Sequence, residues 1–260
     1  MSTFLFDKII FGPVKSRRLG VSLGINLLPV NRKVCNFNCI YCECGWNDEI
    51  RKISGSLPSR EKVYNALEMK LNEMQSAGNL PDVITYAGNG EPTLHPEFPG
   101  IIDDSIMLRN KLAPDAEIAV LSNATAIHKP GIREALLKVD KNILKLDSVS
   151  EITIETHNQP LTRVSVPELL KNLASFNGKV VIQTMFVRGS YKGNLIDNTT
   201  TDEVNGWLRA LEHIKPMEVM IYTISRDTPP GAELVKVPLK DLNAIAARVE
   251  KLRIKTSVSA

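Results

Sequence analysis

Long apolar segments and widely spaced cysteines are both absent from this sequence. No stretch reaches the roughly 18 consecutive apolar residues that indicate a transmembrane helix. The N-terminal apolar stretch, Phe4–Phe6, ends at Asp7 and is too short for a signal peptide. The 260 residues include only four cysteines, which does not suit a disulfide-rich secreted domain. We therefore expect a cytoplasmic protein without membrane association, in a compartment that keeps thiols reduced.

The net charge of the chain is small, but the charged residues are unevenly distributed. The chain carries a net charge of +3, whereas residues 1–34 alone carry +5, from six cations against Asp7. Such a basic segment either steers an anionic substrate or nucleic acid, or forms a solvated surface strand. The overall balance is weaker than the basic footprint of a dedicated nucleic-acid binder.

The four cysteines fall within ten residues, and three of them have the spacing C-x3-C-x2-C. These three are Cys35, Cys39 and Cys42 in the run CNFNCIYC. We call residues 35–44, which also include Cys44, the cysteine loop. A four-iron cluster normally takes four cysteine thiolates, so a loop that offers three leaves one iron without a protein ligand. An open metal position can bind a substrate or cofactor. The spacing thus favours a reactive iron–sulfur cluster.

Two other uses of these cysteines stay open at this point. A disulfide framework is typical of small secreted domains, not of a chain of this length. A structural zinc site would take Cys44 as its fourth ligand and close one loop on itself through the tight C-x-C of Cys42 and Cys44. Zinc sites more often pair two C-x2-C knuckles across a longer spacer. In the cluster interpretation, Cys44 is a small buried residue or a neighbour of the cluster.

Strand-like and helix-like runs alternate after the basic segment. We expect strands at 24–29, 82–88, 117–122, 142–147, 179–187 and 218–224, and helices at 59–76, at 130–139, after Ser165 and from Thr200 to His213. This alternation predicts a parallel sheet with right-handed crossovers. At about 30 residues per unit, the chain has room for six βα units, not for the eight of a closed barrel.

The predicted fold class is therefore α/β, as an open, partial (βα)6 barrel. We expect a final helix at 240–253, with an edge strand at IKTSV. No repeat or linker marks a second domain, so residues 1–260 form one domain: a basic segment 1–23, a core of about 24–225 and an extension 226–260. Chemistry in such folds lies at the carboxyl ends of the strands, where the cysteine loop is placed.

A second motif follows the next predicted strand, in TYAGNGEPTLHP. Gly88 and Gly90 allow close approach of the backbone to a ligand, and Glu91 offers a carboxylate to an ammonium group. Together with CNFNCIYC, in which Tyr41 is the aromatic residue, this sequence resembles the radical S-adenosylmethionine (SAM) enzymes. Their C-x3-C-x-aromatic-C and GGEP motifs correspond to these two segments. Asn89 replaces the second glycine, a mild departure because asparagine tolerates left-handed backbone conformations.

The resemblance implies two cofactors and their contacts. A [4Fe-4S] cluster is held by the three spaced cysteines, and SAM chelates the open iron. Reduction then cleaves SAM to methionine and a 5′-deoxyadenosyl radical, which abstracts a hydrogen atom. SAM contacts are implied for the segment from Gly88 to Glu91 and for Ser122 and Asn123, which end the third predicted strand. Tyr222, at the end of the sixth, lies near where the family holds adenine.

Candidate residues on the substrate side come from one strand and three loops. Lys145 and Asp147 share one face of the fourth predicted strand. They form either an interior salt bridge or contacts to the substrate, because a parallel strand is normally apolar on both faces. Arg17 and Arg18, in the loop SRRLG, suit phosphate or carboxylate. The other loops are THNQPLTR (156–163) and RGSYKGN (188–194). His157, in the first of them, either donates or accepts a proton or is a simple surface residue, which a lone loop histidine more often is.

The upstream run GPVKSRRLGVSLGINLLP resembles a subgroup related to wyosine synthases, which modify a guanine in transfer RNA. The resemblance covers roughly residues 10–225. Those archaeal enzymes carry a second cluster, which the single remaining Cys44 cannot hold.

The implied partners are an electron donor of flavodoxin or ferredoxin type and a substrate such as tRNA or another nucleotide-containing molecule. The alternatives are an activase of a glycyl radical enzyme, with a protein partner, and a non-catalytic iron–sulfur or zinc protein, which leaves GNGEP unexplained.

Overall fold

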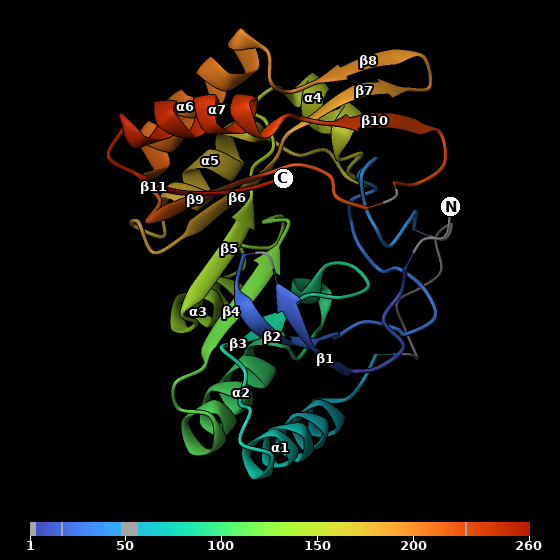
Figure 1. Ribbon diagram of the computed structural model, residues 1–260, viewed down its shortest axis with the longest axis vertical. Coiled ribbons are helices and arrows are strands. Elements are labelled where there is room, and N and C mark those ends of the chain that lie inside the picture. The colour runs from blue at the N-terminus through green and yellow to red at the C-terminus, as the bar shows by residue number, and fades with distance from the viewer. Residues whose placement is uncertain (1–3, 17, 48–56, 227) are drawn as a thin grey trace.

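An eight-stranded sheet forms the frame of the molecule. The computed structural model describes residues 4–16, 18–47, 57–226 and 228–260. The sheet curls into a half-barrel (Figure 1) with the strand order β1-β2-β3-β4-β5-β6-β9-β11. All neighbouring strands are parallel except β1, which runs antiparallel to β2. The strands are β1 (Ile10–Ser16), β2 (Gly20–Ile25), β3 (Val83–Tyr86), β4 (Glu117–Ser122), β5 (Lys141–Lys145), β6 (Val181–Met185), β9 (Glu218–Tyr222) and β11 (Lys255–Ser259).

Helices connect the parallel strands and cover the outer face of the half-barrel (Figure 1). Their starts follow local sequence signals: Ser59 and Thr200 accept the backbone N–H bonds of Lys62 and Glu203, as N-caps do. The helices are α1 (Arg60–Ser76), the short 3-10 helix η1 (Pro92–Leu94), α2 (Phe98–Leu112), α3 (Pro130–Lys138), α4 (Glu151–His157), α5 (Val166–Ala174), α6 (Thr201–Ile214) and α7 (Leu239–Glu250).

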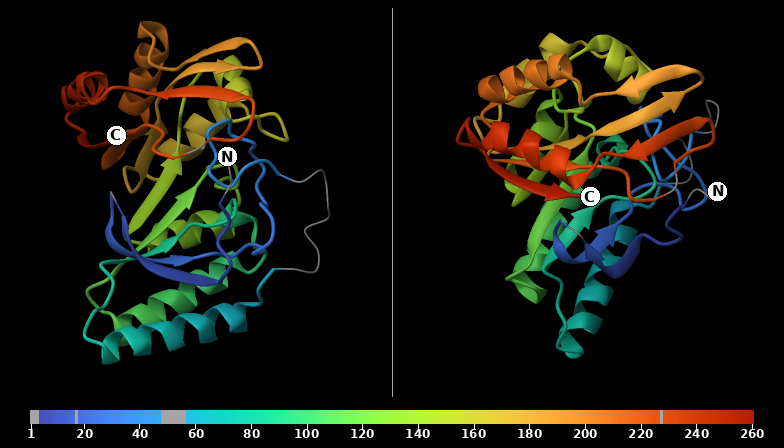
Figure 2. Two further views of the ribbon diagram at one scale, coloured as in Figure 1. Left: turned by 45° about the vertical axis from the view of Figure 1, so that its right-hand side comes forward. Right: turned by 45° about the horizontal axis from the view of Figure 1, so that its top comes forward.

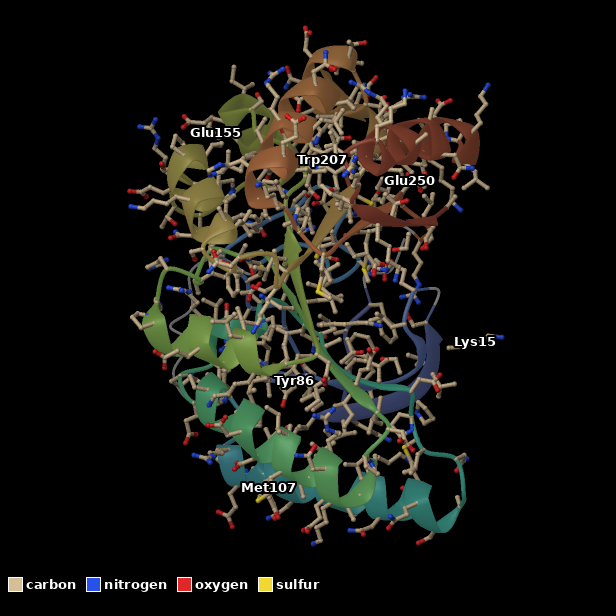
Figure 3. The ribbon with its side chains drawn as sticks, turned by 90° about the vertical axis from the view of Figure 1, so that its left-hand side faces the viewer. Lys15, Tyr86, Met107, Glu155, Trp207 and Glu250 are labelled. Carbon is tan, nitrogen blue, oxygen red and sulfur yellow. The ribbon has the colours of Figure 1, made fainter. Side chains whose placement is uncertain are left out.

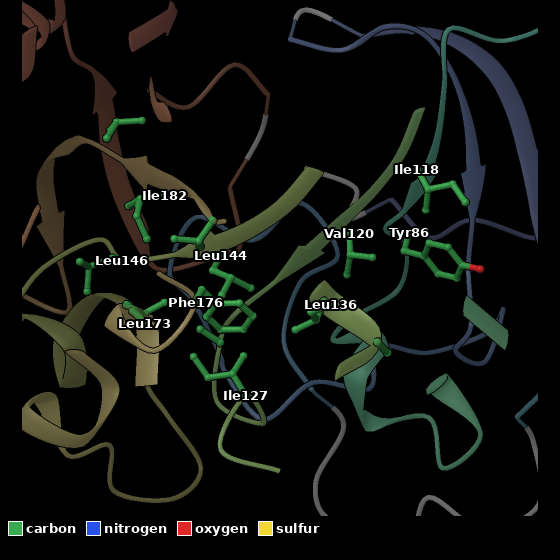
Figure 4. Packing of buried hydrophobic residues seen from close by; sticks show 14 of the residues in the cluster. Tyr86, Ile118, Val120, Ile127, Leu136, Leu144, Leu146, Leu173, Phe176 and Ile182 are labelled. Carbon is green, nitrogen blue, oxygen red and sulfur yellow. The ribbon is translucent and has the colours of Figure 1, made fainter. Parts of the chain in front are cut away.

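The main apolar core lies between the sheet and these helices. Figure 4 shows Tyr86, Val120 and Leu144 of the strands beside Leu136 and Phe176, all fully buried. Burying one such side chain stabilises the fold by about 1.5–3 kcal/mol. The inner face of the sheet has its own apolar layer, which the turn between β1 and β2 covers with Leu19. The half-barrel is therefore filled with side chains below the level of its loops.

The predicted partial barrel is confirmed, and the six predicted strands are β2, β3, β4, β5, β6 and β9. The final helix and edge strand are confirmed as α7 and β11. The bounds of the first strand were wrong: β2 ends at Ile25 instead of 29. Asn26 turns the chain there, because its side chain accepts from Leu28 N (3.2 Å) and donates to Leu28 O (3.0 Å).

A second, three-stranded sheet was not predicted. It has the order β10-β7-β8, with β7 (Val187–Tyr191), β8 (Asn194–Asp197) and β10 (Ala232–Lys236). The segment 188–194, expected as a loop, is instead most of an antiparallel hairpin. Both views in Figure 2 place this small sheet beside the N-terminal segment. Val187, Tyr191 and Ile196 pack against the cysteine loop, so the small sheet forms one wall of the region around the thiols.

Candidate functional site

A cavity of about 160 Å³ lies at the carboxyl edge of the half-barrel, where the loops after β2, β3 and β4 meet. Its lining residues come from segments far apart in the sequence. They are Lys33, Cys35, Phe37, Cys39, Tyr41, Cys42, Cys44, Gly88, Gly90, Glu91, Leu121, Ser122, Asn123, Lys145 and Gln183. Ten of the residues singled out in the sequence are among them. Asn89, Asp147, His157, Tyr222 and Arg18 are not, and Arg17 lies outside the described residues.

Backbone hydrogen bonds hold the cysteine loop from two sides. Val34 N donates to Asn89 O (2.8 Å), which joins the loop to the turn after β3. Asn38 N donates to Asn158 O and Ile40 N to His157 O, each at 2.9 Å, which joins it to the end of α4. All four cysteines are free thiols. Among residues 4–16, 18–47, 57–226 and 228–260, no three or more His, Cys, Asp or Glu side chains are arranged to hold one metal ion.

The surroundings of the thiols shift the pKa values of Cys35 and Cys42 in opposite directions. Burial raises the pKa of Cys35 to about 12. A hydrogen bond with Cys44 lowers the pKa of Cys42 to about 5, and the ammonium of Lys33 acts in the same direction. The Cys44 thiol also donates to Gly88 O (3.4 Å). Cys44 is thus half-buried between Cys42 and the turn after β3, as expected of a neighbour of the cavity.

The turn after β3 can be formed only with glycine at two positions. Gly88 and Gly90 have φ values of 136° and 141°. A Cβ on Gly90 would lie 1.8 Å from Val34 O, and one on Gly88 would lie 2.5 Å from Asn26 Oδ1. Asn89 is fully buried and donates to Phe6 O and Pro29 O, each at 2.9 Å, while it accepts from Phe6 N. Asparagine thus has a side-chain role here that the family's glycine lacks.

The Glu91 carboxylate is almost fully buried, and both of its oxygens already accept hydrogen bonds. Oε1 accepts from Thr93 N (3.1 Å), Thr93 Oγ1 (2.5 Å) and Ser122 Oγ (2.8 Å), and Oε2 accepts from Asn123 N (2.7 Å). Burial raises the pKa of Glu91 despite these bonds. Asn123 Nδ2 in turn lies 3.6 Å from Cys35 Sγ. Glu91 therefore joins the ends of β3 and β4 beside the first cysteine.

A buried polar network surrounds Tyr41. Its hydroxyl donates to Asp147, and Lys145 Nζ lies 3.1 Å from the Tyr41 oxygen and 3.5 Å from Asp147 Oδ2. Asn158 Nδ2 donates to Tyr41, to Asp147 (both 2.8 Å) and towards Cys39 Sγ (3.5 Å). Burial lowers the pKa of Lys145, but the charges of Asp147, Tyr222 and Cys39 together outweigh it, so the net shift is upward and the ammonium is retained. The pair is an interior ion pair whose cation lines the cavity.

Arg18 reaches the barrel interior from the turn between β1 and β2. Its guanidinium lies 4.4 Å from the centre of the Tyr222 ring and donates to Gln183 Oε1 (3.3 Å). Gln183 lines the cavity, and both Arg18 and Tyr222 donate to its Oε1, so they contact the cavity through Gln183. Of the predicted basic segment, Arg18 and Lys33 thus turn inward, whereas Lys8 and Lys15 are exposed, and Figure 3 shows Lys15 reaching outward from β1.

His157 was expected at the surface of a loop, and this prediction is wrong. It is the last residue of α4 and is only 3% exposed, and its Nδ1 has no hydrogen-bond partner in the part of the chain that the structure describes. The cysteine loop lies against the end of α4, where Ile40 N donates to His157 O, and the local sequence does not indicate this contact between distant segments. Burial lowers the pKa of His157, and the Asp147, Glu203 and Asp197 charges oppose this only in part.

This shift predicts a pH dependence of stability. The unfolded chain takes up the His157 proton near pH 6.5, before the folded chain does. Its neutral form therefore contributes full stability above about pH 6.5, and stability falls as pH drops, by at most about 1.4 kcal/mol per pH unit. The free energy of unfolding, measured with urea between pH 5 and 7, should change less with pH in His157→Gln than in the unsubstituted chain. His213→Gln, at an exposed site, should keep the pH dependence of the unsubstituted chain. An equal pH dependence in all three proteins would contradict the assignment.

Similarity to individual proteins identifies the family of this chain. No protein-family model matches it. A UPF0026 protein from Synechocystis sp. is 33% identical over 230 residues, and the match covers 86% of this chain and 78% of that protein. The chain belongs to the UPF0026 family.

This UPF0026 chain also matches longer proteins. It is 29% identical over 229 residues to a protein called GTPase Obg from Brachyspira hyodysenteriae, but spans only 31% of its length. The chain contains no G-x-x-x-x-G-K-[ST] phosphate-binding loop, so the GTPase name finds no support in its residues.

Solved structures with the same fold are radical SAM enzymes. A radical SAM methyltransferase from Sphaerobacter thermophilus superimposes with a TM-score of 0.65 at 13% identity, over 92% of this UPF0026 chain and 66% of that one. Archaeal TYW1 gives a TM-score of 0.53 at 13% identity, over 88% and 71%. The chain therefore has the fold of these enzymes. None of its helices among the described residues is long and apolar enough to cross a membrane.

Several residues that line or support the site were not predicted, among them Lys33, Asn158 and Phe37. Lys33 was counted only as part of the basic segment, although its ammonium turns into the cavity. Asn158 contacts Cys39 across 119 residues of sequence, and no local pattern indicates this contact. Phe37 lies inside the cysteine loop and is 5% exposed. Its apolar side chain between two cysteines could have predicted that it packs beside them.

Proposed function

We propose that this UPF0026 protein is a radical SAM enzyme. The observation that carries the proposal is the convergence of three spaced thiols and the GNGE turn on one cavity, at the carboxyl edge of a radical SAM fold. The cysteines alone are compatible with zinc, and GNGE alone with a plain turn. A zinc or disulfide role, however, gives no reason for the second motif to lie beside the first.

The residues around the cavity fit an iron–sulfur cluster. Thiolates are the ligands that iron–sulfur clusters take, and one thiolate binds each iron, so the cysteines need not converge on a single point. Cys35, Cys39 and Cys42 would hold three irons, and SAM would occupy the fourth. The buried side chains of Phe37, Ile40 and Val187 pack with the loop and exclude water. When bound, the two cofactors supply a 5′-deoxyadenosyl radical by reductive cleavage of SAM.

The surrounding side chains position these groups. Glu91 fixes the ends of β3 and β4, so that Ser122 and Asn123 stand beside Cys35. The two glycines let the backbone of residues 88–90 approach SAM closely. We assign Tyr41 to the SAM side as well, with its ring held by Asp147 and Asn158. Tyr222 would contact the cavity through its hydroxyl, which donates to Gln183 Oε1.

For the substrate, we propose a nucleotide-containing molecule such as tRNA. Support comes from the wyosine-synthase-like run at 12–29 and from the exposed cations Lys8 and Lys15 on the N-terminal side. The single cysteine outside the proposed ligand set argues against a second cluster and therefore against the wyosine reaction itself. An electron donor of flavodoxin or ferredoxin type would supply the reducing electron.

The test is anaerobic reconstitution of the full chain with iron and sulfide, followed by addition of SAM and dithionite. We expect iron and sulfide in a ratio near one, and the appearance of 5′-deoxyadenosine and methionine by liquid chromatography. Absence of 5′-deoxyadenosine from a protein that has taken up its cluster would overturn the catalytic proposal. For the substrate, crosslinking in cells should enrich tRNA, and enrichment of one large protein instead would favour the activase.

A further inference from the structure

Lys33 is a buried cation without an anionic partner among the described residues. It is 5% exposed, and its ammonium lines the cavity together with all four cysteines. Its Nζ donates to Gly45 O at 2.8 Å and contacts Cys42. No carboxylate of the described chain forms an ion pair with it, since Glu43 binds Arg226 and Glu91 binds Thr93, Ser122 and Asn123.

An isolated buried charge is strongly unfavourable unless an opposite charge accompanies it. Among the described residues, the groups that line the cavity with Lys33 and interact with its charge are the four thiols, Cys44 as well as the three spaced cysteines. Neutral thiols or a disulfide would leave the ammonium uncompensated. A cluster held by three thiolates has a net negative charge, and reduction makes that charge larger by one electron. The position of Lys33 therefore suits an anionic occupant, and suits its reduced form better than its oxidised form.

We infer that Lys33 is the counter-ion of the cluster and raises its reduction potential. The inference rests on the proposed function. Net charge and the hydrogen bonds around the sulfurs set the potential of such clusters, and a cation a few ångströms away in a dry site favours the added electron. Lys33 thus makes the reducing electron easier to accept from the donor, without itself touching the substrate.

The measurement is the midpoint potential of the reconstituted holoprotein, from an anaerobic titration followed by electron paramagnetic resonance. Lys33→Met should lower the ratio of reduced to oxidised cluster at a fixed potential by about tenfold, which equals about 59 mV for a one-electron couple. Lys33→Arg keeps the charge and should restore the potential. Lys15→Gln removes one charge at an exposed site of the same segment and should leave the potential unchanged.

Each outcome separates the inference from the proposed function. If the midpoint potential of Lys33→Met is unchanged, the inference is overturned, whether or not the variant still cleaves SAM. The same holds if the variant only binds SAM more weakly at an unchanged potential. Loss of the cluster in Lys33→Met but not in Lys33→Arg, with the far-ultraviolet circular dichroism unchanged, supports the counter-ion role. Loss in both variants assigns Lys33 to the bond with Gly45 and overturns the role of its charge. Failure of the unsubstituted chain to take up a cluster overturns the proposed function instead.

Discussion

Cys39→Ala should abolish formation of 5′-deoxyadenosine and remove most of the bound iron. Cys39 is 7% exposed and lies beside Lys145, Asn158 and the other two spaced thiols, and alanine at this position offers no sulfur to replace the thiolate ligand of one iron. The lost sulfur is about the size of one methylene, so the folded state should lose only about 0.8 kcal/mol. Iron content, the visible absorption of the cluster and product formation test this together.

The matched control is Cys44→Ala, which removes the one cysteine outside the proposed ligand set. Its thiol contacts Cys42 and Gly88 O, and the variant should keep its iron content and the same fold. If Cys39→Ala retained its cluster and turnover, the ligand assignment would be wrong. If Cys44→Ala lost its iron as completely as Cys39→Ala, a four-cysteine site of the zinc type would gain support.

Gly90→Ala should destabilise the fold and empty the site at the same time. The new Cβ would lie 1.8 Å from Val34 O, a backbone atom that accepts from Glu91 N at 3.0 Å and directly precedes Cys35. Together with the unfavourable φ of 141°, the displacement should cost roughly 3 kcal/mol in urea unfolding. Since Val34 has to move, Cys35, the first proposed ligand, should move with it, and iron uptake should fall sharply.

Gly78→Ala separates the two causes of this loss. Gly78 also has a positive φ, 68°, but a Cβ there would meet no atom within 4 Å. It should cost only about 1 kcal/mol, from the backbone conformation alone, and leave iron uptake intact. Equal losses of stability in the two alanine variants would show that the contact with Val34 is unimportant.

Features encoded by neighbouring residues were predictable from the sequence. Ser59 and Thr200 begin their helices as expected, and β4 has the predicted bounds of 117–122. The cysteine spacing and the GNGE turn also lie at adjacent strand ends, because parallel strands bring their carboxyl ends to one edge. These signals fix the half-barrel and the place of the cavity.

Features that depend on distant segments were not predictable. The run from 179 to 187 has the composition of one strand, but Phe186 N donates to Tyr222 O and the chain leaves the main sheet there. The small sheet then needs β10, about 45 residues later, to pair with β7. In the same way, nothing near Lys33 in the sequence says that it turns inward, because its acceptor is on Gly45.

The bonds that shape the cysteine loop have a consequence for damage and repair. They join Val34, Asn38 and Ile40 to Asn89, Asn158 and His157, and all are between atoms of the polypeptide. Small zinc domains, by contrast, gain their folded shape from the metal. A loop that keeps its form through its own chain can lose iron to oxygen and be reloaded without refolding. Exposure to air should therefore inactivate this protein reversibly, with recovery limited by the supply of iron and sulfide.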